Sequence, residues 1–164
     1  MLKIAALTIL FLVCGLCGAF VMRQMQVRVR ELEAARYLLG GIKAQLQYSR
    51  APLLPMLRGL AEGGNAPAFL TECVERMERG EAFPPAWRGA LEAAALPKVD
   101  RLALAGMAET LGATDAAGQM EAISLYEKNL DTLIADARHT RDTRGKSAVM
   151  LGVLAGITVA VLFI

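Results

Sequence analysis

The side chains that could support catalysis are few, and their spacing does not combine them into a catalytic set. The only histidine, His139, lies in the basic segment 137–141, where a metal site or a general base would have no partner. Glutamates recur at helical spacing at Glu72, Glu75 and Glu78, beside two arginines, which is typical of a solvated helix face. We therefore predict no catalytic residues, no metal and no cofactor, and expect a protein that is not an enzyme.

Two further motifs do not predict a site either. The glycines at 59, 63 and 64 belong to no phosphate-binding loop, because neither the lysine motif nor a preceding strand accompanies them. Cys14 and Cys17 form a C-x-x-C pair, but no histidine or charged residue lies near them to activate a thiol or complete a metal site. We interpret both cysteines as small apolar residues of a helix.

The chain is apolar at both ends and polar in the middle. Residues 4–22 and 147–164 carry no charged side chain. At 1.5 Å per residue, each run would form a helix of about 27–28 Å, close to the hydrocarbon thickness of a bilayer. The sequence predicts transmembrane helices at 1–22 and 147–164, with one domain at 23–146 between them. A secretory signal peptide is the alternative for the first run, but the run continues without turn residues into a helical pattern, which favours an uncleaved anchor.

Basic residues flank the predicted spans on one side. Beyond the spans, on the side of the chain ends, only Lys3 is basic. In the middle segment, seven basic residues lie close to the spans: Arg23, Arg28, Arg30, Arg138, Arg141, Arg144 and Lys146. This asymmetry predicts a cell-membrane protein with a cytoplasmic middle domain. We call Arg138, Arg141, Arg144 and Lys146 the basic collar. We expect these four residues to set the topology and to attract anionic lipid. The net charge of the whole chain is only +2, which argues against a nucleic-acid-binding field.

Proline and glycine divide the middle segment into about six predicted helices, and no part of it alternates with the period of a strand. The fold class is therefore all-α, a helical bundle between two transmembrane helices. The predicted helices lie at about 23–47, 52–63, 67–79, 83–96, 100–111 and 116–146.

Apolar residues at 3-4 spacing predict the buried face of each helix. In the first helix, Gly40-Gly41 interrupts the pattern and indicates a bend or a close helix contact. In the fifth helix, we predict a stripe at Leu102, Ala105, Met107 and Leu111. Trp87, the only tryptophan, is a candidate core anchor.

The turn before the last helix has two interpretations that the sequence leaves open. Gly112 suits a helix stop and Asp115 suits the cap of the next helix. In the first interpretation, the turn only orients two helices. In the second, this corner presents Asp115 and Gln119 to a cytoplasmic partner. We call the set Leu111, Gly112, Asp115 and Gln119 the 111–119 corner.

Three segments in order resemble the stage III sporulation protein AB family of endospore-forming bacteria. They are Gln45-Leu46-Gln47-Tyr48 before Pro52-Leu53, then Ala86-Trp87 before Leu91, then Glu109-Thr110-Leu111-Gly112 with Asp115 and Gln119. The most specific element is Leu-Gly-x-x-Asp-x-x-x-Gln, and the resemblance extends over the whole chain. The family is similar to the cytoplasmic domain of the inner-membrane platform protein of type II secretion and type IV pilus systems.

The resemblance implies a membrane platform in a channel complex that links mother cell and forespore. Its domain would lie in the mother-cell cytoplasm and dock a secretion-type ATPase and other sporulation channel proteins, and self-association is left open. The alternative is a two-span helical sensory or signalling module. That alternative would need the domain outside the cell, whereas the charge asymmetry predicts the reverse.

Overall fold

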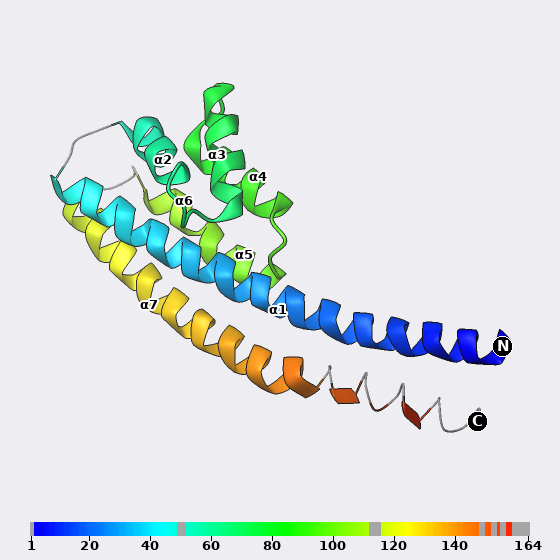
Figure 1. Cartoon of the computed structure of the whole chain (residues 1–164). Helices are drawn as coiled ribbons and strands as arrows, with labels where there is room; N and C mark the ends of the chain where they lie inside the picture. Colours follow the sequence, from blue (N-terminus) through cyan, green and yellow to red (C-terminus); the bar gives the residue numbers. More distant parts are fainter. Residues whose placement is uncertain are drawn as a thin grey trace. The chain divides into compact units, whose positions relative to one another are not determined.

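The computed structural model describes residues 2–48, 52–111 and 116–147, together with positions 150, 151, 154, 157 and 158. In these residues every regular element is a helix and none is a strand, as the sequence predicts (Figure 1). The elements are α1 (Leu2–Tyr48), α2 (Leu53–Ala61), α3 (Ala68–Glu78), α4 (Phe83–Ala93), α5 (Lys98–Ala105), α6 (Met107–Thr110), α7 (Ala116–Thr140) and the π-helix η1 (Arg141–Gly145).

The predicted spans at the two ends do not gain support from the structure. Within the described residues, no helix reaches both the length and the mean hydropathy of a membrane span. The transmembrane helices at 1–22 and 147–164 therefore stay predictions from the sequence.

The chain divides into two compact units. The terminal unit comprises Met1–Val29 and Asp136–Ile164, and the helical domain comprises Arg30–Ala135. Helices α1 and α7 each contribute residues to both units. The domain boundaries therefore fall inside these long helices, at different positions from the predicted ends of the apolar runs.

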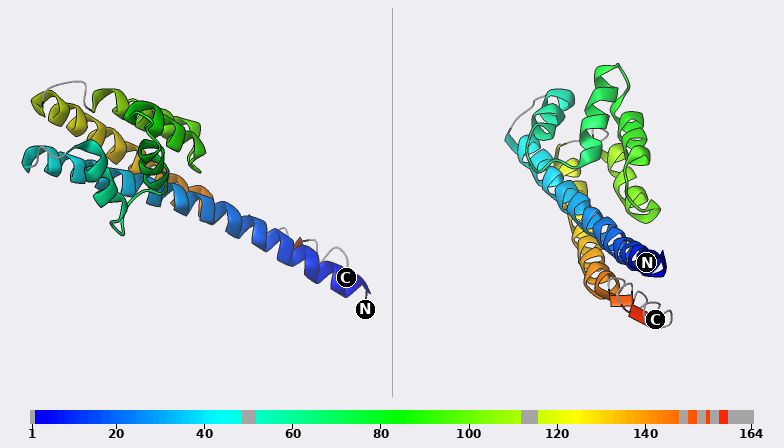
Figure 2. Two further views of the ribbon diagram at one scale, coloured as in Figure 1. Left: turned by 90° about the horizontal axis from the view of Figure 1, so that it is seen from above. Right: turned by 45° about the vertical axis from the view of Figure 1, so that its right-hand side comes forward.

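In the helical domain, α1 and α7 run antiparallel and side by side (Figures 1 and 2). The two helices bury facing apolar stripes, as their 3-4 spacing predicts. The buried residues are Leu32, Ala35, Leu38, Leu39 and Ile42 of α1, with Ile123, Leu130 and Ile134 of α7.

The glycine pair in α1 makes a close helix contact. The helix continues through Gly40 and Gly41 without a break. A Cβ built on Gly41 would lie 2.7 Å from Leu60 Cδ2 of α2, whereas one on Gly40 would meet nothing within 4 Å. The sequence left open whether these glycines mark a bend or a close helix contact. The structure shows a close helix contact, and Gly41 makes it.

Helix α3 contacts both α2 and α4, and α4 also contacts α5 and α6. Each of α2, α3 and α5 begins directly after a proline: Pro52, Pro67 and Pro97. Proline fixes φ near the helical value and lacks an N–H, so it suits the first residues of a helix. These three boundaries agree with the sequence to within a few residues.

The predicted fifth helix is wrong in its extent and, for its first half, in its buried face. It is divided at Gly106 into α5 and α6, and Leu102 is 64% exposed. The buried residues are Asp100, Leu104, Met107, Ala108 and Leu111, so the prediction is confirmed at Met107 and Leu111 and wrong at Leu102 and Ala105. A carboxylate begins the buried stripe, and hydropathy assigns a carboxylate to the surface, so the sequence misplaced the buried face at the start of the helix.

The predicted last helix, 116–146, is also interrupted. It is α-helical to Thr140 and then becomes the π-helix η1. A Cβ built on Gly145, the buried last residue of η1, would lie 2.5 Å from Met22 Sδ and 3.4 Å from Met25 Sδ of α1. A glycine at 145 therefore lets η1 and α1 approach each other closely within the terminal unit.

Candidate functional site

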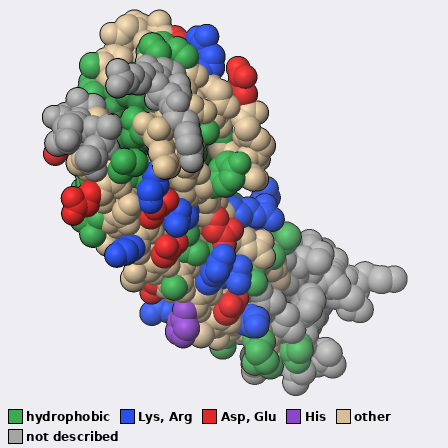
Figure 3. All heavy atoms as spheres, turned by 90° about the vertical axis from the view of Figure 1, so that its left-hand side faces the viewer, with side chains coloured by type: hydrophobic (Ala, Val, Ile, Leu, Met, Phe, Trp, Pro, Cys, Tyr) green, Lys and Arg blue, Asp and Glu red, His purple; other side chains and the backbone are tan. Residues whose placement is uncertain are grey.

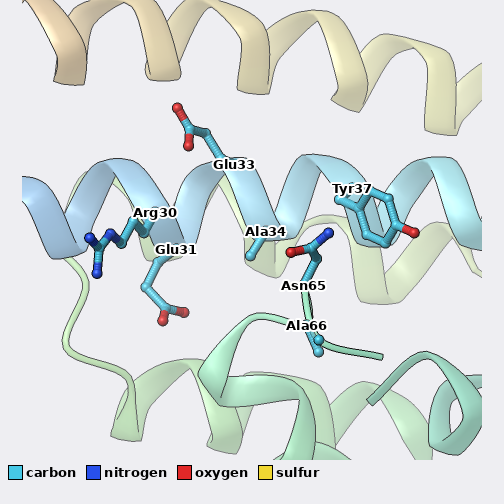
Figure 4. Close-up of a pocket in the computed structure, with 8 residues that line it drawn as sticks. Arg30, Glu31, Glu33, Ala34, Tyr37, Asn65 and Ala66 are labelled. Carbon is cyan, nitrogen blue, oxygen red and sulfur yellow. The ribbon is translucent and has the colours of Figure 1, made fainter. Parts of the chain in front are cut away.

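A groove of about 450 Å³ lies in the helical domain, between one face of α1 and the turn that precedes α3 (Figure 4). We call it the α1 groove. Its α1 side carries Arg30, Glu31, Glu33, Ala34 and Tyr37, and its other side is Gly64, Asn65 and Ala66.

One wall of the groove is held in place by a hydrogen bond between α1 and α3. The backbone N–H of Ala68, the first residue of α3, donates to Glu31 Oε2 at 3.0 Å. The preceding residue, Pro67, supplies no side-chain cap, so Glu31 takes that role from another helix. Glu31 therefore positions the 64–66 turn against α1.

The side chains left at the surface of the groove are aromatic and polar. Tyr37 is 61% exposed, and Asn65 reaches from the turn toward Ala34 and Tyr37, whereas Glu33 points the other way (Figure 4). A tyrosine offers a rigid apolar ring with a hydrogen-bonding tip, and an amide offers both donors and an acceptor. This combination is common in protein–protein contacts. It contains no nucleophile with an adjacent base.

A second polar cluster joins α1 to α7 within the helical domain. Glu127, whose side chain is 13% exposed, accepts from Arg36 Nη1 at 2.7 Å and from Lys43 Nζ at 3.1 Å. Lys43 also donates to Ser124 Oγ at 2.9 Å, and Arg36 Nε contacts Asp131 Oδ1 at 3.0 Å. We call this cluster the Glu127 clamp. Because its members come from facing turns of two antiparallel helices, it fixes their register.

Trp87 lies in the core, with 1% of its surface exposed. Its Nε1–H donates to the backbone oxygen of Leu104 at 3.0 Å. The ring of Phe69 meets it edge-on at a centroid distance of 5.0 Å, and that of Phe83 lies 5.5 Å away. Trp87 thus joins α3, α4 and α5 and has no surface to offer a partner. Cys73 of α3 is also fully buried, and burial raises the pKa of its thiol to about 12.

The 111–119 corner is only partly visible. Leu111 is buried and Gln119 is half-buried. Gly112 and Asp115 lie outside the described residues, so the predicted helix stop and helix cap stay predictions.

The basic collar lies in the terminal unit, on and around η1. Arg138, Arg144 and Lys146 are exposed, and Arg141 is half-buried. Arg141 Nε contacts Asp142 Oδ1 at 2.9 Å, and this hydrogen bond holds the pKa of the Asp142 carboxyl below its usual value. Across the unit, Arg28 of α1 pairs with Asp136 of α7 at 3.6 Å.

Among the described residues, no group of histidine, cysteine and carboxylate side chains could hold a metal ion. On the face that Figure 3 shows, lysine and arginine side chains are interleaved with aspartate and glutamate. Such a surface offers no extended field of one sign.

The sequence reasoning missed the α1 groove and the Glu127 clamp. A signal for the groove is present, because Tyr37 is a large aromatic residue on the polar face of α1, seven residues after Arg30. No local signal predicts that Asn65 lies beside it, since that depends on how the α2–α3 turn folds onto α1.

Comparisons with known proteins add a family and a fold. The model of a family described as stage III sporulation protein AB matches residues 3–164. Among solved structures, a chain titled "Stage III sporulation protein AB (SpoIIIAB)" is similar, with a TM-score of 0.62 at 22% identity, covering 71% of this chain and 98% of that one. At this identity, the structural likeness speaks for the fold alone. The curated proteins contain no match.

Proposed function

The chain belongs to the stage III sporulation protein AB family, and on that basis we propose that it is a non-enzymatic membrane platform of the stage III sporulation machinery. In this proposal the runs 4–22 and 147–164 cross the membrane, and the helical domain lies in the mother-cell cytoplasm. The complex that it joins is a secretion-like channel between mother cell and forespore, and the chain holds membrane and cytoplasmic components together.

The observation that carries the proposal is the continuity of α1. One helix, Leu2–Tyr48, contains both the uncharged run 4–22 and the buried stripe Leu32–Ile42 of the helical domain. Between these two parts, α1 has neither a proline nor a turn. In this proposal the same element serves as anchor and as scaffold.

The α1 groove is the surface that we propose for docking a cytoplasmic secretion-type ATPase. Its volume of about 450 Å³ accommodates a few side chains of a partner. Glu31 holds the turn in place, so little ordering is left to be done on binding. Tyr37 then contributes exposed aromatic area at a low cost in side-chain entropy.

The test uses the full-length chain in a spore-forming host whose own copy has been replaced. The membrane fraction is washed with carbonate, solubilised and used to recover the ATPase with the tagged chain. We expect Tyr37→Ala to lower ATPase recovery and spore yield, because it removes the main contact of the groove.

Leu125→Ala is the matched control, since Leu125 on α7 is exposed to a similar extent, 60%. This variant should behave as the wild type does. Unchanged recovery with Tyr37→Ala would exclude the groove as the docking surface. Release of the wild-type chain by carbonate would contradict the membrane part of the proposal.

A further inference from the structure

We infer that the terminal unit binds the headgroup of an anionic phospholipid, and that Arg23, Arg144 and Lys146 build this site. The inference rests on the proposed membrane location, and it replaces the general lipid attraction predicted for the basic collar by one site that also includes Arg23 of α1. All three side chains are exposed.

The contact at Gly145 brings the three cations together from two helices. Gly145 of η1 packs against Met22 and Met25 of α1, close enough that any Cβ at 145 would collide with Met22 Sδ. Arg23 follows Met22 directly, and Arg144 and Lys146 flank Gly145. The sequence alone predicts that Arg23 and the basic collar flank the spans on one side, and the contact at Gly145 places the two segments that carry them next to each other.

The carboxylates of this region are too few to neutralise it. Between the two apolar runs, the terminal unit has six lysine and arginine side chains and two acidic ones, Asp136 and Asp142. Asp136 pairs with Arg28, and Asp142 accepts from Arg141 while also lying near Lys146 and His139. A surplus of positive charge therefore remains at Arg23, Arg144 and Lys146.

The position of this surplus favours a lipid headgroup as the ligand. Arg23 comes one residue after the run 4–22, and Lys146 one residue before the run 147–164. When both runs fill the hydrocarbon layer, these side chains lie at the depth of the lipid phosphates. Arginine and lysine bind phosphate well, and their long stems let them reach the interface while the stems stay in an apolar environment.

The test measures lipid binding to the full-length chain in detergent micelles by native mass spectrometry. Phosphatidylglycerol and phosphatidylcholine are titrated separately into the wild type and into the triple variant R23Q/R144Q/K146Q. We expect the wild type to prefer phosphatidylglycerol. The triple variant should bind it about a hundredfold more weakly, because three charges each contribute about fivefold near an anionic surface.

The control variant R79Q/K98Q/K128Q loses the same charge from exposed positions of the helical domain and should keep the preference. The charge-preserving variant R23K/R144K should also keep most of it. Equal binding of the two lipids by the wild type would overturn the inference, and so would an equal loss in the two glutamine variants. Since binding is measured in micelles, these outcomes stand whether or not carbonate releases the chain from membranes.

Discussion

Two helix–helix contacts in the helical domain differ in how much charged side chains contribute to them. The centre of the α3–α4 contact is apolar, with Trp87 enclosed by Phe69 and Phe83, and a single charged side chain, Arg76 of α3, lies against Gly89 of α4 beside it. The α1–α7 contact buries an apolar stripe as well, but the Glu127 clamp borders it with charged side chains. Apolar burial supplies stability without much preference for register, whereas paired charges discriminate between registers at a modest gain in stability. The long helices, which lead into the predicted spans, are therefore the pair whose register is specified.

The largest effect that we expect follows from truncating the aromatic core. Trp87→Ala should lower the free energy of unfolding by about 3–5 kcal/mol, because it removes a fully buried ring and its hydrogen bond to Leu104. The measurement is urea unfolding of the fragment 23–146 followed by circular dichroism, and we expect this fragment to be helical and soluble. Tyr37→Ala, at an exposed aromatic residue, should change stability by less than about 0.5 kcal/mol. Equal effects of the two variants would contradict the assignment of Trp87 to the core.

The clamp should give a smaller effect that depends on salt. Glu127→Gln should lower the free energy of unfolding by about 1–2 kcal/mol, which lies between the values for exposed and for buried ion pairs. We expect an intermediate value because Glu127 is nearly buried, while Arg36 and Lys43 are about one-third exposed. Asp131→Asn is the matched control, since Asp131 contacts the same arginine from a 58% exposed position, and it should cost less than about 0.5 kcal/mol.

Salt should separate the two regions further. In 1 M NaCl the penalty of Glu127→Gln should shrink, because salt screens part-exposed ion pairs, while that of Trp87→Ala should stay the same. If both penalties respond equally to salt, the contrast between the apolar and the charged contact is wrong.

The apolar region should also carry a pH dependence of its own. The Cys73 thiol has a pKa of about 12 in the folded chain, against 9.0 for a free thiol. Above pH 9 the unfolded chain releases this proton and the folded chain does not, so stability present below pH 9 is lost as pH rises toward 12. Between pH 8 and 10 we expect the wild type to lose about 1 kcal/mol more than Cys73→Ala does. Parallel pH profiles of the two proteins would contradict this burial effect.

The features that the sequence predicts best are those that depend on neighbouring residues. Pro52, Pro67 and Pro97 each precede a helix because the ring acts on its own backbone. The stripes of α1 and α7 are predictable because their buried residues are apolar. The first half of the α5–α6 stripe is not, because Asp100 is buried there through tertiary packing, which no local rule describes.

Sites that join distant segments escape the sequence for the same reason. The α1 groove needs Asn65 beside Tyr37, and that depends on the hydrogen bond between Ala68 and Glu31. The cluster of Arg23 with Arg144 and Lys146 needs the contact of Gly145 with Met22, inside a π-helix that has no sequence signature. Charge counting predicted the basic collar, but not that Gly145, between two of its members, lies against α1.

The smallest effect concerns the two adjacent glycines of α1, which differ only in what they face. Alanine is favoured over glycine within a helix by about 1 kcal/mol. Gly40→Ala should gain most of this amount, because a Cβ there meets nothing within 4 Å. Gly41→Ala should gain less stability or none, because its Cβ would lie 2.7 Å from Leu60 Cδ2 and the leucine must move.

The double variant Gly41→Ala with Leu60→Ala separates the helix propensity of alanine from the contact with Leu60. If the Leu60 contact is the cause, adding Gly41→Ala to Leu60→Ala should stabilise the fragment about as much as Gly40→Ala stabilises the wild type. A gain at Gly41 that equals the gain at Gly40 in the wild type would show that α2 does not depend on glycine for its approach to α1.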